Sequence, residues 1–261
     1  ISSVAMAELV AGTEEEFIRR MNERAKELGM NNTNFVNSYG LDDDNHYSTA
    51  YDVAIMSREL IRKFPEISTY STIWMDSIIH TTKKGQSEFG LTNTNRLVRF
   101  YDGITGLKTG STSQAKYCLS ATANREGMDL IAVIMAAPST KQRFNEASKL
   151  LDYGFANCKL FKDNNKDLEI NPIQVTKGVK DELIYKVNED FSYLCMKKTS
   201  PEDITKEVIL EEGVEAPIQE NEKVGEVIYS INNKKIGSVD IVAGETINKA
   251  TYINRLNQVF H

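Results

Sequence analysis

The most constraining stretch of this 261-residue sequence is a pair of apolar runs joined by a short polar turn. The first run is Tyr117–Ala123 and the second is Leu130–Met135, with the turn Asn124–Gly127 between them. Two β-type runs separated by a glycine-containing turn predict an antiparallel hairpin. Because the second run is apolar at every position, we expect it to be a central strand that is covered on both faces.

Helix signals flank this hairpin on both sides. Thr13 opens a capping box, in which its hydroxyl bonds the Glu16 amide and the Glu16 carboxylate reaches back to the cap. A helix should follow as far as Gly29, which is well placed to end it. Two further helices are predicted after paired capping hydroxyls, one after Ser48-Thr49 and one after Ser139-Thr140, the latter ending before Gly154. Residues 1–159 are therefore expected to form an α+β domain, with helices packed on an antiparallel sheet.

Beyond residue 160 the sequence changes to short alternating runs separated by polar turns. Six strands are predicted there: Ile170–Val175, Leu183–Val187, Phe191–Met196, Glu207–Leu210, Val224–Ile231 and Lys235–Val242. The turn Asn232-Asn233-Lys234 joins the last two as a hairpin. Several short strands at regular spacing predict a small all-β domain, a sandwich or a barrel, over residues 160–261.

Charge and composition exclude several classes of function. The chain has 31 Lys and Arg against 37 Asp and Glu, a net charge of −6, so binding to a nucleic-acid backbone is not expected. The histidines are scattered and the acidic triplet at residues 42–44 lacks the glycine and glutamate of a calcium loop, so we interpret the triplet as a solvated turn. Cys118, Cys158 and Cys195 are too scattered for disulfides or zinc and are interpreted as buried apolar side chains. No metal, nucleotide or organic cofactor is implied.

The first residues of the chain, ISSVAMAELVA, have the apolar character of a helix interior. They include neither an initiating methionine nor the basic and apolar regions of a signal peptide. Natural termini are usually polar and frayed. We therefore expect the chain to begin partway through a larger fold, with an apolar surface that another segment covers.

One short run could carry chemistry: Gly106–Thr112, GLKTGST, just ahead of the hairpin. A lysine ammonium can bind an anionic substrate group, hydroxyls can orient it, and Gly110 lets a ligand approach the backbone closely. Taken alone, however, Lys-Thr-Gly is a weak motif, and a turn entering a strand is the simpler interpretation.

Longer stretches change that interpretation. They resemble the low-molecular-mass penicillin-binding D-alanyl-D-alanine carboxypeptidases, in which Lys-Thr-Gly accompanies a Ser-x-x-Lys and a Ser-x-Asn element. The matching stretches are Val4–Gly12, Ala25–Leu41, Asn45–Ala50, Asn93–Leu97, Gly103–Thr112 and Ala115–Met135. Trp74–Asp76, Asn93–Tyr101 and Ala115–Cys118 are most similar to the sporulation-associated branch of Gram-positive spore formers. The family's β-rich second domain also distinguishes it from the β-lactamases.

The resemblance implies a β-lactamase/transpeptidase-like catalytic domain, incomplete at its N-terminus, and acyl transfer through a serine. Lys108 is the implied catalytic residue, and Lys108 and Thr112 would hold the terminal carboxylate of a peptidoglycan pentapeptide. Lys108 and Thr109 would border the cleft, Gly110 would allow close approach, and the Ser111 N–H would be one oxyanion donor. β-Lactam antibiotics would acylate the same serine.

The nucleophilic serine that the family carries has no counterpart among residues 1–261. The family carries Ser-x-x-Lys and Ser-x-Asn upstream of the segment that matches Val4–Gly12. Ser113–Lys116 fits Ser-x-x-Lys but leads into a strand, whereas the chemistry needs its serine at a helix N-terminus. Ser230–Asn232 fits Ser-x-Asn but lies at a predicted hairpin turn. We therefore expect residues 1–261 to be catalytically incomplete.

Two rival functions stay open at this stage. The chain could be a shortened, non-catalytic homologue that binds peptidoglycan or a cell-wall or sporulation partner, or it could be a β-lactamase. The resemblance places the whole protein outside the cytoplasmic membrane, attached only through a C-terminal anchor that residues 1–261 do not include. The N-terminal segment, as a separate chain, is a further candidate partner.

Overall fold

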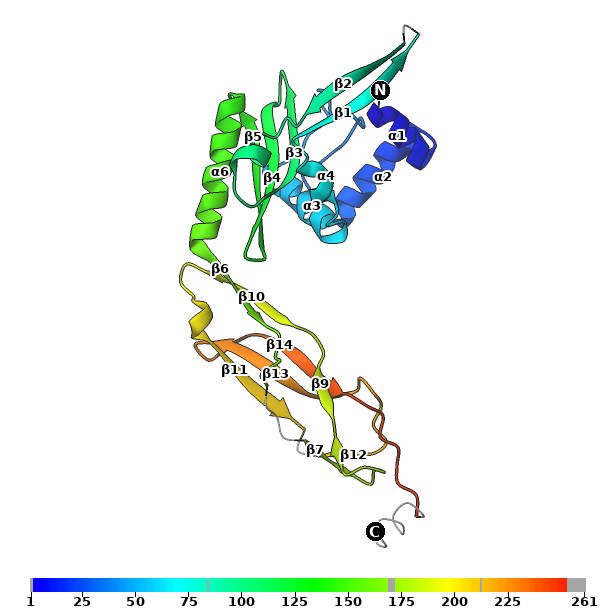
Figure 1. Cartoon of the computed structure of the whole chain (residues 1–261), viewed down its shortest axis with the longest axis vertical. Helices are drawn as coiled ribbons and strands as arrows, with labels where there is room; N and C mark the ends of the chain where they lie inside the picture. The colour runs from blue at the N-terminus through cyan, green and yellow to red at the C-terminus, as the bar shows by residue number, and fades with distance from the viewer. Residues whose placement is uncertain (1, 84, 169–171, 212, 253–261) are drawn as a thin grey trace. The chain divides into compact units, whose positions relative to one another are not determined.

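The computed structural model describes residues 2–83, 85–168, 172–211 and 213–252 (Figure 1). The chain divides into two compact units, Ile1–Ala156 and Asn157–His261. Each unit has an apolar core of its own and is described separately. None of the helices in the described stretches is both long and apolar enough to cross a membrane.

The helices of the first unit are α1 (Ser2–Ala11), α2 (Glu14–Glu27), α3 (Ala50–Lys63), α4 (Ile67–Ser71), α5 (Leu97–Phe100) and α6 (Thr140–Asn157). The predicted helices after the three caps are confirmed as α2, α3 and α6. The Thr49 hydroxyl accepts the Asp52 amide at 3.1 Å, which fixes the start of α3. The prediction that the third helix ends before Gly154 is wrong, because α6 continues to Asn157. At Gly154 the helix lies close to the sheet, because a Cβ there would be 2.6 Å from the end of the Leu130 side chain.

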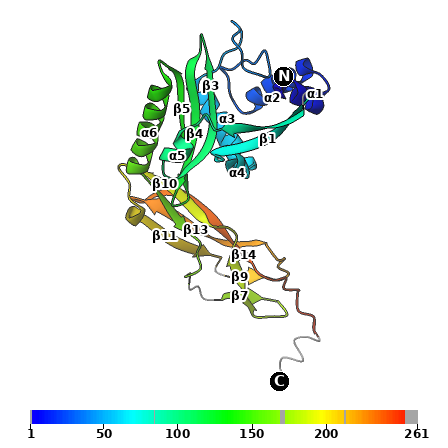
Figure 2. The same ribbon diagram turned by 45° about the horizontal axis from the view of Figure 1, so that its top comes forward.

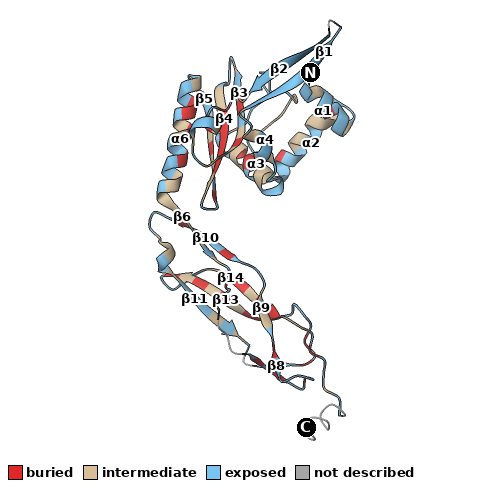
Figure 3. Ribbon diagram, in the orientation of Figure 1, coloured by how far each residue is buried: buried red, intermediate tan, exposed pale blue. Residues whose placement is uncertain are grey.

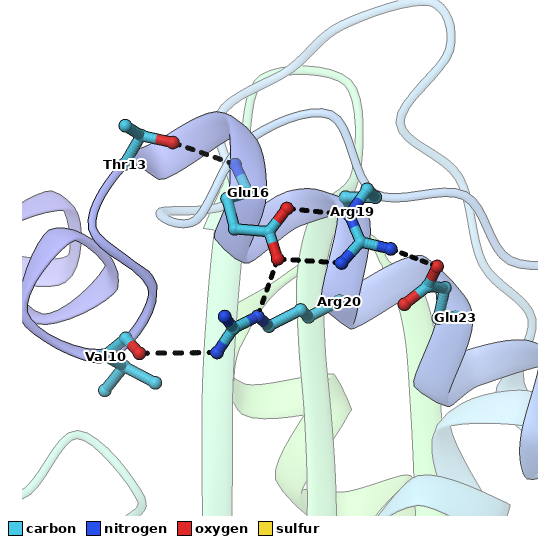
Figure 4. Close-up of polar contacts among 6 residues, drawn as sticks. All are labelled: Val10, Thr13, Glu16, Arg19, Arg20 and Glu23. Atoms are coloured by element: carbon cyan, nitrogen blue, oxygen red, sulfur yellow. Dashed lines mark hydrogen bonds and ion pairs between the residues drawn. The ribbon is translucent and has the colours of Figure 1, made fainter.

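The capping box predicted at α2 is only half formed (Figure 4). The Thr13 hydroxyl accepts the Glu16 amide at 3.1 Å, as predicted. The Glu16 carboxylate, however, accepts hydrogen bonds from Arg19 Nε at 2.7 Å and Arg20 Nε at 2.8 Å. These arginines lower the pKa of Glu16 to about 2, and Arg20 also reaches the Val10 carbonyl at 3.4 Å. The Glu16 carboxylate, which was expected to cap the helix, is thus hydrogen-bonded to two guanidinium groups instead.

The predicted hairpin is confirmed and forms most of a three-stranded antiparallel sheet of the order β3-β4-β5. Its strands are β3 (Ile104–Thr112), β4 (Lys116–Arg125) and β5 (Met128–Ala137). The two-residue turn Glu126-Gly127 has positive φ at both positions, as such hairpins require. Helix α6 covers one face and α3 lies against the other (Figures 1 and 2). The core of the unit lies between the sheet and α6 and includes Leu119, Phe144 and Leu151.

The prediction of a central strand for Leu130–Met135 is wrong. This run forms β5, which lies at an edge of the described sheet, whereas β4 is central and is buried from residue 119 to residue 123 (Figure 3). The run Leu130–Met135 within β5 is nevertheless apolar because α3 and α6 both contact this strand. Coverage by helices on two faces produces the same apolar run as a central position in the sheet.

A second hairpin of the first unit consists of β1 (Met75–Thr82) and β2 (Gly85–Thr92). The sequence predicts short β-like runs over residues 78–91, and the hairpin confirms them. Every described residue of both strands is exposed, and Figure 3 shows the hairpin extending away from the sheet.

The second unit is built almost entirely of strands. They are β6 (Cys158–Asp163), β7 (Ile173–Thr176), β8 (Glu182–Leu183), β9 (Tyr185–Val187), β10 (Phe191–Met196), β11 (Ile204–Leu210), β12 (Val214–Glu215), β13 (Lys223–Ile231) and β14 (Lys234–Ala243). The sheets have the orders β11-β13-β14-β9, β12-β7-β8 and β10-β6. The all-β prediction is confirmed, and Asn232 and Asn233 form the predicted turn with positive φ. The start of the strand predicted at Ile170 lies outside the described residues.

The core of the second unit centres on Tyr229, which is fully buried and stacks on Phe191 with the ring centroids 3.8 Å apart. Strands β6 and β12 were not predicted from the sequence: β12 has only 2 residues, and β6 ends in the charged pair Lys162-Asp163. The predicted strand Leu183–Val187 is divided between β8 and β9, which belong to different sheets. Of the three cysteines, only Cys195 is buried as predicted; Cys118 and Cys158 are half-buried, and all three are free thiols.

Candidate functional site

All five residues singled out by the sequence lie together on β3, from Lys108 to Thr112. Lys108, Gly110 and Ser111 are exposed, whereas Thr109 is buried. The alternation follows from the strand geometry, which turns successive side chains to opposite faces. Strand β3 is bonded to β4 on one side only within the described sheet. Its other edge can accept a further extended chain.

Beside Lys108 the structure has a cleft of about 730 Å³. Its walls come from α3, α4 and the β3–β5 sheet, and its lining is mostly apolar, with Met56, Leu60, Tyr70 and Leu107 among the lining residues. The Lys108 ammonium donates a hydrogen bond to the Thr109 carbonyl at 2.5 Å.

Two of the residues that line this cleft are serines that are hydrogen-bonded to each other. Ser57 of α3 and Ser120 of β4 are buried, with their hydroxyl oxygens 2.7 Å apart, and Ser57 donates to the Val53 carbonyl at 2.7 Å. Neither hydroxyl bonds a lysine or a histidine within the described part of the chain. This pair therefore ties α3 to the sheet and lacks the adjacent base that an activated serine nucleophile needs.

The start and middle of β3 are held by the segment Asn93–Asn95. The Asn95 side chain is 1 % exposed; its Nδ2 donates to the Gly106 carbonyl at 3.0 Å, and its Oδ1 accepts the Leu97 amide at 3.2 Å. The hydroxyl oxygens of Thr94 and Thr109 are 2.6 Å apart. This segment resembles the family in sequence, but no role for it was predicted from the residues.

The end of β3 is held by Asp42. Its carboxylate accepts hydrogen bonds from the Thr112 hydroxyl at 2.5 Å, the Ser113 hydroxyl at 3.2 Å and the Gln114 amide at 3.4 Å. The bond from Thr112 is the main reason that the pKa of Asp42 lies below its usual range. Asp42 is exposed, as expected for the predicted solvated turn at residues 42–44, but its carboxylate also holds the end of β3. Its long-range contact has no signature in the local sequence.

The loop ahead of α3 is organised by a buried carboxylate. Asp52 is 1 % exposed and accepts hydrogen bonds from the Thr33 hydroxyl at 2.7 Å and the Asn32 amide at 2.9 Å. His46 packs its ring edge-on against Phe35, with the centroids 5.8 Å apart. Through this loop Gly40 reaches the wall of the cleft.

The two rejected motif matches lie in the structural contexts that were predicted for them. Ser113–Ala115 form the turn between β3 and β4, and Lys116 is the first residue of β4. Ser230–Asn232 lies where β13 enters its hairpin turn. Neither serine is at a helix N-terminus. Among the described residues, no group of three or more His, Cys, Asp or Glu side chains is arranged to hold a metal ion.

Comparisons with known proteins agree with this arrangement. The family model described as D-alanyl-D-alanine carboxypeptidase matches residues 2–139, and the model of the penicillin-binding protein 5 C-terminal domain matches residues 155–249. The crystal structure of penicillin binding protein 5 from Haemophilus influenzae is similar to the chain with a TM-score of 0.68 and 32% identity, covering 94% of this chain and 70% of that one.

Curated relatives give the same result over the length of the chain. The D-alanyl-D-alanine carboxypeptidase DacF of Bacillus subtilis is 37% identical over 98% of this chain and 65% of its own length. The D-alanyl-D-alanine carboxypeptidase DacA of Haemophilus influenzae is 31% identical over 98% of this chain and 63% of its own length. The chain thus spans slightly less than two thirds of these relatives. It belongs to the D-alanyl-D-alanine carboxypeptidase family.

Proposed function

We propose that the whole protein is a serine-type D-Ala-D-Ala carboxypeptidase that removes the terminal D-alanine from peptidoglycan stem peptides through an acyl-enzyme. The observation that carries this proposal is the position of Lys108, which lines an apolar cleft beside the free edge of β3. Membership of the family and the names of the relatives support the same reaction.

In this proposal the substrate lies along β3 and its terminal carboxylate is bound by the Lys108 ammonium. Apart from Gly110 itself and its two chain neighbours, no atom lies within 4 Å of its Cβ position, so the substrate backbone can approach there. The exposed Ser111 offers its N–H as an oxyanion donor. The Thr112 hydroxyl already donates to Asp42, so it can donate to the substrate only if its proton turns away from that carboxylate.

The proposed nucleophile is the serine of the family's Ser-x-x-Lys element. Three described serines are not candidates: Ser57 donates to the Val53 carbonyl, Ser113 donates to Asp42, and Ser120 is hydrogen-bonded to Ser57. None of these hydroxyls has a lysine or histidine partner in the described structure. The residues of β3 bind and orient the substrate. Since the substrate is part of the cell wall, the proposal places the whole protein on the outer side of the cytoplasmic membrane, where β-lactam antibiotics would acylate it.

The test uses the full-length protein with a fluorescent penicillin and a peptide ending in D-Ala-D-Ala. The wild type should be labelled covalently, should keep the label for many minutes and should release D-alanine. Lys108→Gln should slow acylation about 100-fold, as expected when one group that stabilises charge is removed from an active site.

Lys116→Asn is the matched control. Lys116 is exposed and has a φ of 53°, a backbone conformation that asparagine tolerates, so this change removes a nearby lysine charge without strain. Its acylation rate should equal that of the wild type. Absence of labelling in the wild type would refute the carboxypeptidase proposal, and rapid loss of the label with hydrolysed penicillin would identify a β-lactamase instead.

A further inference from the structure

Within the described residues, the hairpin of β1 and β2 is a two-stranded sheet of its own that projects from the first unit (Figure 3). It carries five large apolar side chains, each between 43 % and 70 % exposed: Met75, Ile78, Ile79, Phe89 and Leu91. Two strands alone are marginally stable in water, and exposed apolar side chains gathered on one element mark an interaction site. A further strand beside the hairpin would complete a sheet.

The backbone of β1 has hydrogen-bonding groups available along its free edge. Trp74 and Asn93 form a hydrogen-bonded pair, because the Asn93 amide donates to the Trp74 carbonyl at 2.8 Å. Such pairs alternate with non-hydrogen-bonded pairs along an antiparallel ladder, and the register of this ladder has no shift. The N–H and C=O groups of the odd-numbered residues 75–81 therefore point away from β2. The Ser77 amide accordingly donates to the Asp76 carboxylate, at 2.8 Å.

The side chains of β1 indicate which strand would pair there, because β1 is complementary to itself. If two copies pair antiparallel about a two-fold axis at Ile78, Asp76 of each copy lies opposite His80 of the other, since both are two residues from the axis. A histidine in either charge state can donate a hydrogen bond to a carboxylate. On pairing, the Ser77 amide exchanges the Asp76 carboxylate for a carbonyl of the second copy, which frees Asp76 for His80.

The same register joins apolar side chains into one row. Ile78 lies opposite Phe89 within the hairpin, so the two copies would place two isoleucines side by side with a phenylalanine on each flank. Ile78 and its copy would form a non-hydrogen-bonded pair, the kind in which side chains are closest. The combined sheet has four strands, which is enough for stability where two are not.

Other registers and the other edge are less complementary. An axis at Ser77 would put Asp76 opposite Ile78, and an axis at Ile79 would put His80 opposite Ile78. Strand β2 has Glu88 as its only charged residue, so no pairing of β2 with its own copy matches opposite charges.

We propose that the free edge of β1 is a homodimer interface, at which two copies of the chain join their hairpins into one four-stranded antiparallel sheet. The partner is a second copy because the edge matches itself in charge and in apolar side chains. One strand of 8 residues is a small contact. Interfaces below roughly 1,200 Å² belong to weak, transient complexes, so the dimer is reversible. The inference does not depend on the proposed reaction.

Cysteine cross-linking of the full-length protein tests the register. Ile78→Cys places two thiols opposite each other, with the Cα atoms about 4.5 Å apart, a distance that a disulfide spans, so mild oxidation should give a covalent dimer. Ile79→Cys is the matched control at the neighbouring exposed isoleucine. It lies opposite the partner's Ser77, so its two copies are diagonal neighbours about 7–8 Å apart and should not be bridged. The wild type, with its three native cysteines, gives the background.

Sedimentation of the full-length protein, from micromolar to submillimolar concentration, measures association without a cross-link. Asp76→Lys should raise the dissociation constant at least about tenfold, because it puts two lysines opposite two histidines. Asp76→Lys combined with His80→Asp should restore association, since the two charges have only exchanged places. Glu189→Lys makes the same change in net charge at an exposed position of the second unit and should have no effect.

Three results would overturn the inference. The first is a monomer at every concentration together with no cross-link through Ile78→Cys. The second is a dimer that Asp76→Lys leaves unchanged, because its interface would lie elsewhere. The third is cross-linking of Ile79→Cys as readily as Ile78→Cys, which would exclude the register on which the charge pairing depends.

Discussion

Asn95 provides the sharpest test of how β3 is held. Its side chain is 1 % exposed and bridges two backbone groups, the Gly106 carbonyl at the start of the Lys-Thr-Gly strand and the Leu97 amide at the start of α5. Both hydrogen bonds are buried, so water does not replace them when the side chain is removed. Asn95→Ala should therefore destabilise the first unit.

The magnitude follows from the two groups that lose their partner. Each buried donor or acceptor left unsatisfied costs about 1–3 kcal/mol, so Asn95→Ala should lower the free energy of unfolding by about 2–6 kcal/mol. Asn95→Asp has nearly the same volume and keeps the acceptor for Leu97, but it places a carboxylate oxygen against the Gly106 carbonyl. It should cost at least as much at neutral pH, although it creates no cavity.

Urea unfolding of the full-length protein, followed by Trp74 fluorescence, reports on the first unit, because the Trp74 carbonyl accepts the Asn93 amide at 2.8 Å. Asn32→Ala, at an exposed position, is the control and should change stability by less than about 0.5 kcal/mol. If Asn95→Asp were as stable as the wild type, packing rather than hydrogen bonding would explain the burial of Asn95. Its two hydrogen bonds would then not be what holds the start of β3.

Two further predictions concern Asp42 and the core of the second unit. Because the pKa of Asp42 is lowered in the folded protein, its stabilising effect is present above the usual carboxyl range and is lost as the pH falls through the lowered pKa. Asp42→Asn should therefore melt at a lower temperature than the wild type at pH 7, and the difference should shrink towards pH 3. Tyr229→Ala should destabilise the second unit by about 3–5 kcal/mol, since it removes a fully buried ring stacked on Phe191, and calorimetry should show this in the transition of that unit alone.

Local patterns predicted most of the fold. The hairpin of β4 and β5, the strand Phe191–Met196 and the turn at Asn232 were all visible, because alternation and turn chemistry act over a few residues. The order of strands within a sheet depends on distant segments. For that reason Leu130–Met135 was assigned a central place that β4 occupies.

The candidate site was predictable in part for the same reason. Lys108–Thr112 could be found because a short motif with family context marks it, and the structure keeps these residues on one strand. Asp42, Asn95 and Arg143 act on this strand from separate segments through polar contacts, which have no period in the sequence. The acidic triplet at residues 42–44 in fact resembled a surface turn.

The supports of β3 have a common consequence for function. Asn95 binds the strand at its start, Arg143 binds it at Gly110, and Asp42 binds it at Thr112, so side chains from three segments fix one edge strand along its length. The described sheet has no strand on the open edge of β3, so these side chains hold it where a neighbouring strand would. Under the proposed function, the substrate lies along that open edge. Rate enhancement depends on groups held within fractions of an ångström of the productive geometry. Substitutions at the supports that leave the protein folded should therefore slow acylation, even though none of these side chains need touch the reacting carbonyl.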